Sequence, residues 1–536
     1  MVCLNDRKEF ATVRHFLVLL AVWCGAGGIL NAQVRNVRVS APGAEGPNEV
    51  SIAINPRNPL QLAAGSNLRY FYRSSDGGAT WVQSLLPRGT WGDPCVAFDR
   101  DGVLLYAHLA NLPAPGYFID RLIVHRSTDG GETWVDSVEV GYRPPRAQQD
   151  KEWLAADMTP SPFRGSMYMT WTEFDRYGSA AAGDSSRILF ARSIDRGATW
   201  SAPVRISDRG GNCIDDDNTV EGAVPAVGPE GQIYVSWSGP SGIVFDRSTD
   251  GGSTWGSDVP VSDHPGGWAF DVPGIYRCNG LPVTVCDTGF SSYRGRIYVL
   301  WGDQRNGLED SDVWIASSAD GGGTWTPPKR VNDDLTGRHQ FFPWIAIDQS
   351  TGHLYVVFYD RRETSGTETD VYLARSTDGG GTFTNFRASE SSFVPDPTVF
   401  FGDYTNIAAR DGRVYPIWMR MDGTTLSIWA AAYVDTTVTG AGAPASGPAE
   451  FVLHQNYPNP FNGGTLISFQ TAAPGRVKLS VFDVLGREVR VLVDEERMRG
   501  AYTERFDASG LPTGQYFLQL QAGDGFVQQR RMTYLK

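Results

Sequence analysis

The chain of 536 residues carries 60 acidic and 47 basic side chains, which gives a formal net charge of −13. This acidic balance argues against nucleic acid or an anionic lipid surface as a partner. The seven histidines are scattered and no Cys-x-x-Cys pair is present, so the composition indicates no zinc site and no cofactor.

The first 32 residues have the pattern of a signal peptide. Three basic residues precede an apolar stretch at residues 16–30, and the small residue Ala32 lies at the expected cleavage point. The stretch is short and rich in glycine, and no later segment approaches the roughly 18 apolar residues of a membrane span. We therefore expect an exported chain without a transmembrane segment.

One eight-residue phrase recurs six times between residues 74 and 383, and its first copy reads Ser-Ser-Asp-Gly-Gly-Ala-Thr-Trp. An Asp between a Ser and two glycines suits a tight turn, because its carboxylate accepts hydrogen bonds from N–H groups just downstream. The copies start roughly 50 to 70 residues apart, which predicts one supersecondary unit used repeatedly. The aspartates at the shared position are Asp76, Asp129, Asp195, Asp250, Asp320 and Asp378.

Strand patterns around these copies predict four strands per repeat. Near-continuous apolar runs such as residues 344–347 fit a first strand that is buried on both faces, and the runs that follow alternate better. Six copies of the phrase indicate six units, but counting first strands gives seven, the last at residues 406–409. The seventh unit lacks a fourth strand, which residues 37–40 can supply to close the ring. We expect seven blades, with six as the alternative.

The phrase S-x-D-x-G-x-T-W resembles the Asp-box (BNR) repeat of sialidase-like β-propellers. The resemblance implies an all-β propeller over residues 33–435, with the boxes as structural hairpins on the face away from the active site. It covers the repeat and the ring but not the catalytic set of sialidases. The Arg-Ile-Pro segment of that family is missing from residues 48–52, and Tyr404 beside Asp403 is the nearest match to its Tyr nucleophile.

Side chains at one mouth of the predicted ring form the candidate site. The chain approaches each first strand and leaves each second strand on the face opposite the boxes, where carboxylates, arginines and aromatic rings gather. Such a set suits a sugar, because rings stack on its C–H surfaces while carboxylates and Arg bind its polar groups. The ligand-binding candidates are Trp301, Asp303, Arg305, Phe358, Asp360 and Arg361, and the catalytic candidates are Asp93, Asp150, Glu173, Asp403 and Tyr404.

Three functions stay open for this mouth. The chain could be a propeller that binds glycan or another extracellular ligand, a glycoside hydrolase or lyase with paired carboxylates, or a structural or adhesive surface protein. In the last case the W-x-D-x-R pattern is a clasp in which Asp and Arg lock neighbouring blades together. The oxygen ligands could also hold a divalent cation such as calcium.

The last part of the chain changes in composition. Residues 436–450 are mostly Thr, Gly, Ala, Pro and Ser, which predicts a linker, and six short alternating segments in residues 451–536 predict a small β-sandwich. The motifs at residues 455–462, 481–487 and 511–517 closely resemble the C-terminal sorting domain of type IX secretion cargo in Bacteroidetes-like bacteria. The resemblance implies that the secretion machinery is a partner and that the protein, expected to be monomeric, is secreted or held at the cell surface.

The mature chain keeps four cysteines, for which three pairings exist. An exported protein can oxidise them. Cys278 and Cys286 are eight residues apart across Gly280 and Pro282, so this local pair is the disulfide that we favour.

Overall fold

The structure is a computed structural model. It describes residues 35–86, 89–114, 116–437, 451–471, 475–497, 500–522 and 526–536. The signal peptide predicted at residues 1–32 lies outside these ranges, as does the predicted linker from residue 438 onward. All regular elements in the described ranges are β-strands. Among these residues no helix has the length and apolarity needed to cross a membrane.

Six sheets each consist of four antiparallel strands that follow one another in the sequence. The first three sheets are β2 (Val50–Ile54), β3 (Leu62–Ser66), β4 (Tyr70–Ser74) and β5 (Val82–Leu85); β6 (Thr90–Phe98), β7 (Leu104–Asn111), β8 (Phe118–Ser127) and β9 (Asp136–Val140); and β10 (Gln148–Ala156), β11 (Met167–Phe174), β12 (Ser186–Ser193) and β13 (Val204–Arg205). The next three are β14 (Glu221–Val227), β15 (Ile233–Gly239), β16 (Gly242–Ser248) and β17 (Val259–Ser262); β20 (Val283–Cys286), β21 (Ile297–Asp303), β22 (Asp312–Ser318) and β23 (Lys329–Arg330); and β24 (Gln340–Asp348), β25 (His353–Asp360), β26 (Asp370–Ser376) and β27 (Thr384–Arg387).

A further four-stranded sheet joins the two ends of this part of the chain. It contains β28 (Asn406–Arg410), β29 (Arg413–Asp422) and β30 (Thr425–Val434), with β1 (Arg35–Arg38) on its outer edge. Val37 is opposite Ala430, and Val39 N–H donates to the Ile428 carbonyl at 2.8 Å. The N-terminal segment therefore supplies the outer strand that the last sheet lacks, as the sequence predicted.

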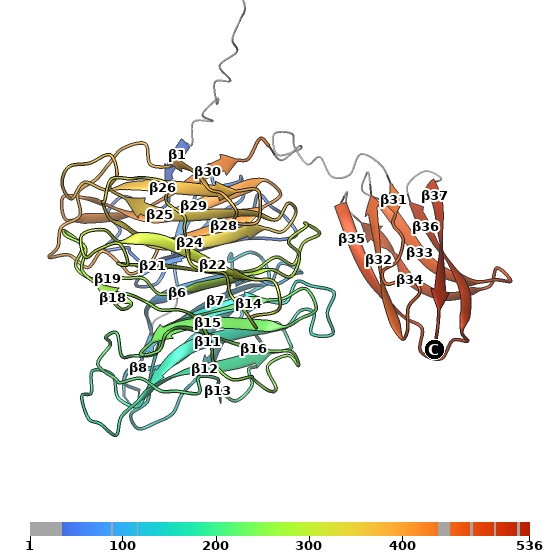
Figure 1. The fold of residues 1–536 in the computed structure, drawn as a ribbon, viewed down its shortest axis with the longest axis horizontal. Coiled ribbons are helices and arrows are strands. Elements are labelled where there is room, and N and C mark those ends of the chain that lie inside the picture. The colour runs from blue at the N-terminus through green and yellow to red at the C-terminus, as the bar shows by residue number, and fades with distance from the viewer. Residues whose placement is uncertain are drawn as a thin grey trace, which may run out of the picture. The chain divides into compact units, whose positions relative to one another are not determined.

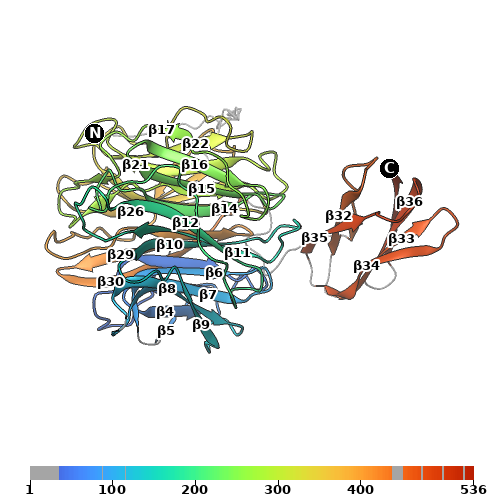
Figure 2. The same ribbon diagram turned by 90° about the horizontal axis from the view of Figure 1, so that it is seen from below.

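The sheets are stacked against one another (Figures 1 and 2), and their contacts run in a closed order. The first strands β2, β6, β10, β14, β20, β24 and β28 contact one another in that sequence, and β28 contacts β2. Trp171, Trp237, Trp301 and Trp418 lie in second strands and are at most 2% exposed. A ring of sheets around buried first strands is the arrangement of a β-propeller.

All six copies of the repeated phrase form the same turn. In the first copy, Thr80 donates its N–H to Asp76 Oδ1 at 2.9 Å and its hydroxyl to Asp76 Oδ2 at 2.6 Å, while Ser74 Oγ donates to Asp76 Oδ1 at 2.8 Å. The corresponding Thr–Asp hydrogen bonds occur in the other five copies. These bonds satisfy the turn's backbone locally, as expected of structural hairpins.

The C-terminal part is a separate pair of sheets with its own core. One sheet contains β31 (Val452–Leu453), β32 (Gly464–Thr471) and β35 (Gly500–Asp507), and the other contains β33 (Gly475–Asp483), β34 (Glu488–Arg497), β36 (Gly514–Ala522) and β37 (Phe526–Tyr534). Ile467, Phe469, Leu479 and Leu518 are fully buried between them. The alternating segments of the sequence thus form a β-sandwich whose inward positions are apolar.

The predicted disulfide is wrong. Cys95, Cys213, Cys278 and Cys286 are all buried and free. Cys278 begins the two-residue strand β19 (Cys278–Asn279), whereas Cys286 ends β20. Cys278 lies opposite Phe270, whereas Cys286 lies opposite Ile297 of β21, so the two cysteines belong to different sheets despite their short sequence separation.

Candidate ligand-binding face at one end of the ring

The starts of the first strands carry an unusual backbone feature. Register shifts interrupt the pairing after Asp150 in β10 and after Glu221 in β14, and similar shifts occur in β6 and β24. Asp93 and Lys151 lie at such bulges with φ of 51° and 53°. A bulge redirects the side chain that it carries. Here it brings charged groups from several sheets together at the end of the ring opposite the boxes.

Lys151 and Asp403 are the centre of this cluster. The Lys151 ammonium is 2.6 Å from Asp403 Oδ2, 3.7 Å from Asp93 Oδ2 and 3.9 Å from Glu49 Oε1, and all four side chains are at most 9% exposed. Arg277 Nε also donates to Asp403 Oδ1 at 2.9 Å. Burial opposes ionisation of Asp403, but Lys151 and Arg277 outweigh it and lower the pKa of this carboxyl. Asp403 is therefore an ionised carboxylate held between two cations.

Three buried carboxyl groups at this end of the ring, Glu49, Asp150 and Glu221, favour the neutral form. Burial, reinforced by the Asp93 carboxyl, raises the pKa values of Glu49 and Asp150. Burial and the Asp215 carboxyl raise the pKa of Glu221, whose two oxygens accept no hydrogen bond from the described residues. Carboxyl groups that outnumber the nearby cations in a buried site favour protonation over ionisation.

Residues 264–282, which we call the strap, cross this end of the ring. The strap contains β18 (Ala269–Phe270) and β19, which lie at the edge of the ring in Figure 1. Phe270, Val272 and Ile275 are buried in the apolar core of the ring, and Asn279 Nδ2 donates to the Asp403 carbonyl at 2.9 Å. The strap thus holds Arg277 over the cluster.

Aromatic and charged groups are exposed on the outer side of the strap. The Arg277 side chain is 47% exposed and its guanidinium is 5.0 Å from the centre of the Phe400 ring. Tyr276 is 58% exposed and 6.1 Å from the same ring. Asp215 lies beside them, 3.7 Å from Arg277, and accepts a hydrogen bond from the Tyr177 hydroxyl at 2.6 Å. We call these five residues the strap platform.

The predicted ligand-binding residues lie in the body of the ring. Asp303 is fully buried and accepts from Arg305 Nε at 2.9 Å and from Trp301 Nε1 at 2.8 Å. Trp301 and Phe358 are 0% exposed. Asp303 and Arg305 pair within one sheet, and Arg305 reaches the preceding sheet at Ser262 Oγ (3.3 Å) and Asp263 Oδ1 (3.9 Å). Arg305 thus completes the clasp of the alternative interpretation, and a ligand-binding role for these residues stays a prediction that the contacts do not favour.

The second W-x-D-x-R-like motif forms its clasp with a different arginine. Arg362 Nε donates to Asp360 Oδ2 at 2.8 Å, whereas the predicted Arg361 is 2% exposed. Arg361 Nη1 donates to the Pro273 carbonyl of the strap at 2.7 Å, and its Nε donates to Thr369 Oγ1 at 3.1 Å. Arg361 thus supports the strap from below.

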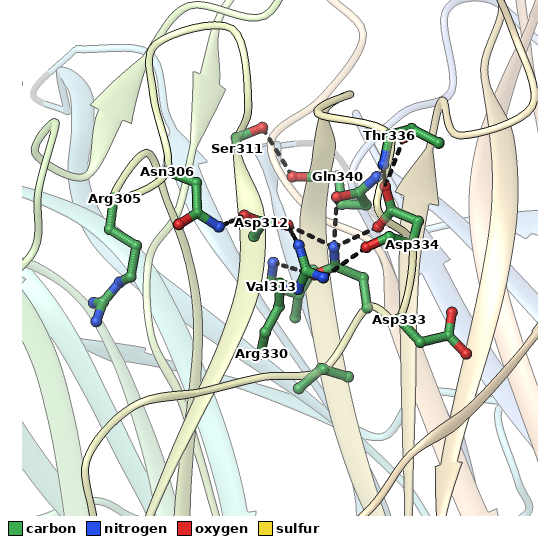
Figure 3. Close-up of polar contacts among 12 residues, drawn as sticks. Arg305, Asn306, Ser311, Asp312, Val313, Arg330, Asp333, Asp334, Thr336 and Gln340 are labelled. Atoms are coloured by element: carbon green, nitrogen blue, oxygen red, sulfur yellow. Dashed lines mark hydrogen bonds and ion pairs between the residues drawn. The ribbon is translucent and has the colours of Figure 1, made fainter.

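A polar network joins the same two sheets beside these clasps (Figure 3). Asn332 Nδ2 lies 2.6 Å from Asp312 Oδ1, 2.7 Å from Asp334 Oδ1 and 2.7 Å from Gln340 Oε1. Asn306 Nδ2 donates to the other Asp312 oxygen at 2.6 Å. Because these acceptors are satisfied internally, we assign the network to the junction between sheets.

The predicted catalytic residues are also enclosed. Asp93, Asp150, Asp403 and Tyr404 are each at most 9% exposed, and Glu173 is 0% exposed. Burial raises the pKa of Tyr404, so its hydroxyl stays protonated and is a poor nucleophile. Within the described ranges, no group of three or more His, Cys, Asp or Glu side chains is arranged to hold a metal ion.

Sequence reasoning missed Lys151, Arg277 and the strap platform as functional candidates. Lys151 lies between Asp150 and Glu152 at the start of a first strand, so its place at the mouth could be predicted from the sequence. The direction of its side chain toward Asp403 depends on the bulge and could not. Arg277 lies in the connection between two sheets, and no repeated motif marks it. The exposed Tyr276 beside it was the available signal.

Comparison with known proteins identifies the C-terminal part. Residues 455–533 match the family described as the secretion system C-terminal sorting domain. This agrees with the three motifs in that part of the sequence. The protein is therefore exported by the type IX secretion system and is secreted or held at the cell surface.

Other known proteins are similar to the chain at lower identity or over a smaller share. A xyloglucanase from Paenibacillus sp. is 27% identical over 205 residues, which are 37% of this chain and only 18% of that protein. An α-L-arabinofuranosidase from Fusarium graminearum is 13% identical, covers 64% of this chain and 93% of its own, and has a TM-score of 0.44. The NanB sialidase from Streptococcus pneumoniae is 9% identical, covers 71% of this chain and 84% of its own, and has a TM-score of 0.41. These similarities assign no activity.

Proposed function

We propose that this exported protein binds a saccharide on the strap platform without hydrolysing it. The observation that carries the proposal is the half-exposed Arg277, which is held by Asp403 and flanked by Phe400 and the exposed Tyr276. Aromatic rings supply stacking surfaces for a sugar, and an oriented guanidinium supplies donors for its hydroxyl or acidic groups. The ion pair with Asp403 fixes the guanidinium before a ligand arrives, which reduces the entropy cost of binding.

The enclosure of the carboxyl groups supports binding over hydrolysis. A glycosidase places two carboxyl groups on either side of the scissile bond, roughly 5 to 10 Å apart. Here the charged cluster lies beneath the strap, and its members Asp93, Asp150 and Asp403 are at most 9% exposed. A substrate bound on the platform does not reach two of these groups unless the strap moves.

A glycoside hydrolase or lyase is the second candidate, and the pattern of pKa values favours it. Burial raises the pKa of Asp150, whereas Lys151 and Arg277 lower that of Asp403 against the effect of burial. Both carboxyl groups are acted on by the Lys151 charge, and carboxyl groups whose pKa values are pushed apart are typical of acid–base catalysis. In this case Asp403→Asn should abolish release of reducing ends or of unsaturated products.

We also infer the organisation of the whole chain. The seven four-stranded sheets at residues 33–435 are seven blades of one propeller, and residues 436–450 link it to the sorting domain at 451–536. The closed order of contacts from β2 to β28 supports the blade number. Limited proteolysis of the mature chain should cut within 436–450, and light scattering should give a monomer.

A glycan array and a hydrolysis screen on the mature chain, residues 33–536, test the proposed function. Tyr276→Ala should weaken binding to the best array ligand at least tenfold. Phe290→Ala is the matched control, because Phe290 is 71% exposed and lies in a loop outside the strap. Equal effects of the two substitutions, or no binding to any glycan, would contradict the platform, and turnover lost in Asp403→Asn would favour the enzyme.

A further inference from the structure

We propose that two adjoining cavities on the sheet β10–β13 bind a polysaccharide that carries carboxylate or sulfate groups. The inference rests on the proposed function, because it extends the same saccharide-binding face and names the ligand class. The first cavity, about 380 Å³, is lined by Arg143, Arg187, Arg205, Ser185, Leu189 and Pro203. Three guanidinium groups and no acidic side chain line it.

Two of these arginines are fixed by one buried carboxylate. Arg143 Nη1 is 2.5 Å from Glu173 Oε1, and Arg187 Nη1 is 3.1 Å from the same oxygen. Arg187 Nη2 also contacts Asp175 at 2.5 Å. The Arg143 side chain remains 55% exposed, so part of its guanidinium faces solvent. Arg187 is only 12% exposed and also donates to the Ser185 carbonyl and hydroxyl, so Arg143 is the one of these two arginines that keeps donors for a ligand.

Arg205 brings a positive charge that no acidic group offsets in an ion pair. Its Nε donates to the Ser207 carbonyl at 2.7 Å and its Nη2 donates to the Asp208 carbonyl at 3.0 Å. It is exposed, and no ion pair among the described residues includes it, although its charge partly offsets the rise in the pKa of Asp258. Two carbonyls thus orient a guanidinium whose remaining donor edge is free. A planar fork of this kind suits carboxylate or sulfate oxygens.

The second cavity has the chemistry of a site for a neutral sugar residue. It measures about 430 Å³, shares Ser185 and Arg205 with the first cavity, and is also lined by Ser179, Asp184 and Asn212. Hydroxyl, carboxylate and amide groups can bind sugar hydroxyls. Because the cavities share two residues, they are neighbours. An acidic sugar can therefore bind in the first cavity while the adjacent sugar of the same polysaccharide binds in the second.

The walls of the second cavity are held together by backbone pairing. A β-bridge joins Ser179 to Cys213, and another joins Ser186 to Gly211. The two loops around the cavity are therefore tied to each other before a ligand binds. Pre-formed walls lower the ordering cost of binding.

The cavities lead toward the strap platform. Ile214 lines the second cavity, and the next residue, Asp215, contacts both Tyr177 and Arg277. A chain of several sugar residues lying in the cavities can therefore continue toward the exposed ring of Tyr276. This continuity favours a polysaccharide over a single acidic metabolite.

Binding of the mature chain to dextran, dextran sulfate, polygalacturonate and its methyl ester tests the ligand class. Dextran and the methyl ester are the uncharged counterparts of the two anionic polymers. We expect at least tenfold tighter binding to an anionic polymer than to its counterpart, weakening as salt is raised. Preference for dextran sulfate or for polygalacturonate then distinguishes sulfate from carboxylate. Equal binding of charged and uncharged polymers would overturn the proposal.

Arg205→Gln tests the site itself. Arg205 forms no ion pair, so its loss should leave the melting temperature unchanged and weaken anionic binding about tenfold. Arg57→Gln removes the same charge from an exposed loop of another sheet and should leave binding unchanged. If both substitutions act equally, the cavities are not the site. If the cavities are not the site, Arg205→Gln leaves binding of the anionic polymers unchanged while Tyr276→Ala still weakens binding. If the proposed function is wrong, Tyr276→Ala leaves binding of neutral and anionic polymers unchanged.

Discussion

Two buried histidines predict that the ring loses stability as the pH falls below 7. His108 in β7 and His125 in β8 are 1% and 6% exposed, and their Nε2 atoms are 3.0 Å apart. His108 Nδ1–H donates to the Leu109 carbonyl at 2.7 Å, so its Nε2 accepts the proton of His125. A further proton on His108 would place two donors against each other. A charge on His125 is disfavoured by burial alone, so the pair is most stable when both rings are neutral.

The size of the effect follows from the shifted pKa values. Burial lowers the pKa of His108 to about 3, with His125 adding to the shift, and burial lowers the pKa of His125 to about 4, against an ordinary value of 6.5. Because the folded-state pKa lies below that of the unfolded chain, the stabilisation is complete above pH 6.5 and is lost as the pH falls toward 4. At pH 5.5 each histidine should cost about 1.4 kcal/mol, as one pKa unit corresponds to that free energy.

Urea unfolding of the mature chain at pH 7.5 and 5.5 measures this loss. The double variant His108→Phe, His125→Phe replaces the pair by two stacked rings that do not titrate. The loss of unfolding free energy between pH 7.5 and pH 5.5 should therefore be about 2 to 3 kcal/mol smaller in this variant than in the parent. His339, whose pKa burial also lowers, titrates in both proteins and cancels in the comparison. His454→Gln, at an exposed position of the sorting domain, is the control. An equal pH dependence in the double variant and the parent would refute the reasoning.

Three further predictions concern stability and export. Asp250→Ala should lower the free energy of unfolding by roughly 1–3 kcal/mol, because it leaves turn amides without acceptors, and should leave glycan binding unchanged; lost binding in a folded variant would contradict the structural role. Asp303→Asn should destabilise by about 3–5 kcal/mol in urea unfolding, since Arg305 loses its buried partner, and an unchanged unfolding midpoint would argue against the clasp. Removing residues 451–536 should leave a folded ring by circular dichroism but abolish surface delivery in the native host, and normal delivery would contradict the sorting role.

The features that the sequence predicted correctly are those encoded by local pattern. The Ser–Asp–Thr contacts lie within a few residues of one another, so the phrase itself specifies the turn. The pairing of β1 with β30 was also predictable, although the partners are almost 400 residues apart in the chain. It followed from the unpaired edge that a three-stranded last sheet would otherwise expose.

The candidate site was harder to predict because it depends on side-chain direction. Arg361 follows a second strand, and this position suggested that its side chain lies at the mouth of the ring. The next residue, Arg362, forms the clasp instead, and Arg361 donates to the strap. The direction of Lys151 depends on a bulge, and the strap carries Arg277 across the ring from a connection without a repeated motif. Periodicity shows which face a strand residue takes, but not where irregular backbone directs a side chain.

The box face and the mouth face of the ring are built on different principles. On the box face, an arginine at the end of a third strand donates to a carbonyl in the turn of the next sheet. The pairs are Arg126 with Arg196, Arg192 with Gly251, and Arg247 with Gly321. All six box turns are thus closed by their own Asp, and three of them are also tied to the preceding sheet by an arginine, so these turns are stabilised by contacts that repeat from sheet to sheet. On the mouth face, the described residues repeat the Asp–Arg clasp in two sheets and the register shift in four, whereas the strap and the paired loops beside β12 each occur once. A change of ligand specificity can therefore come from the mouth loops while the box face keeps the ring intact.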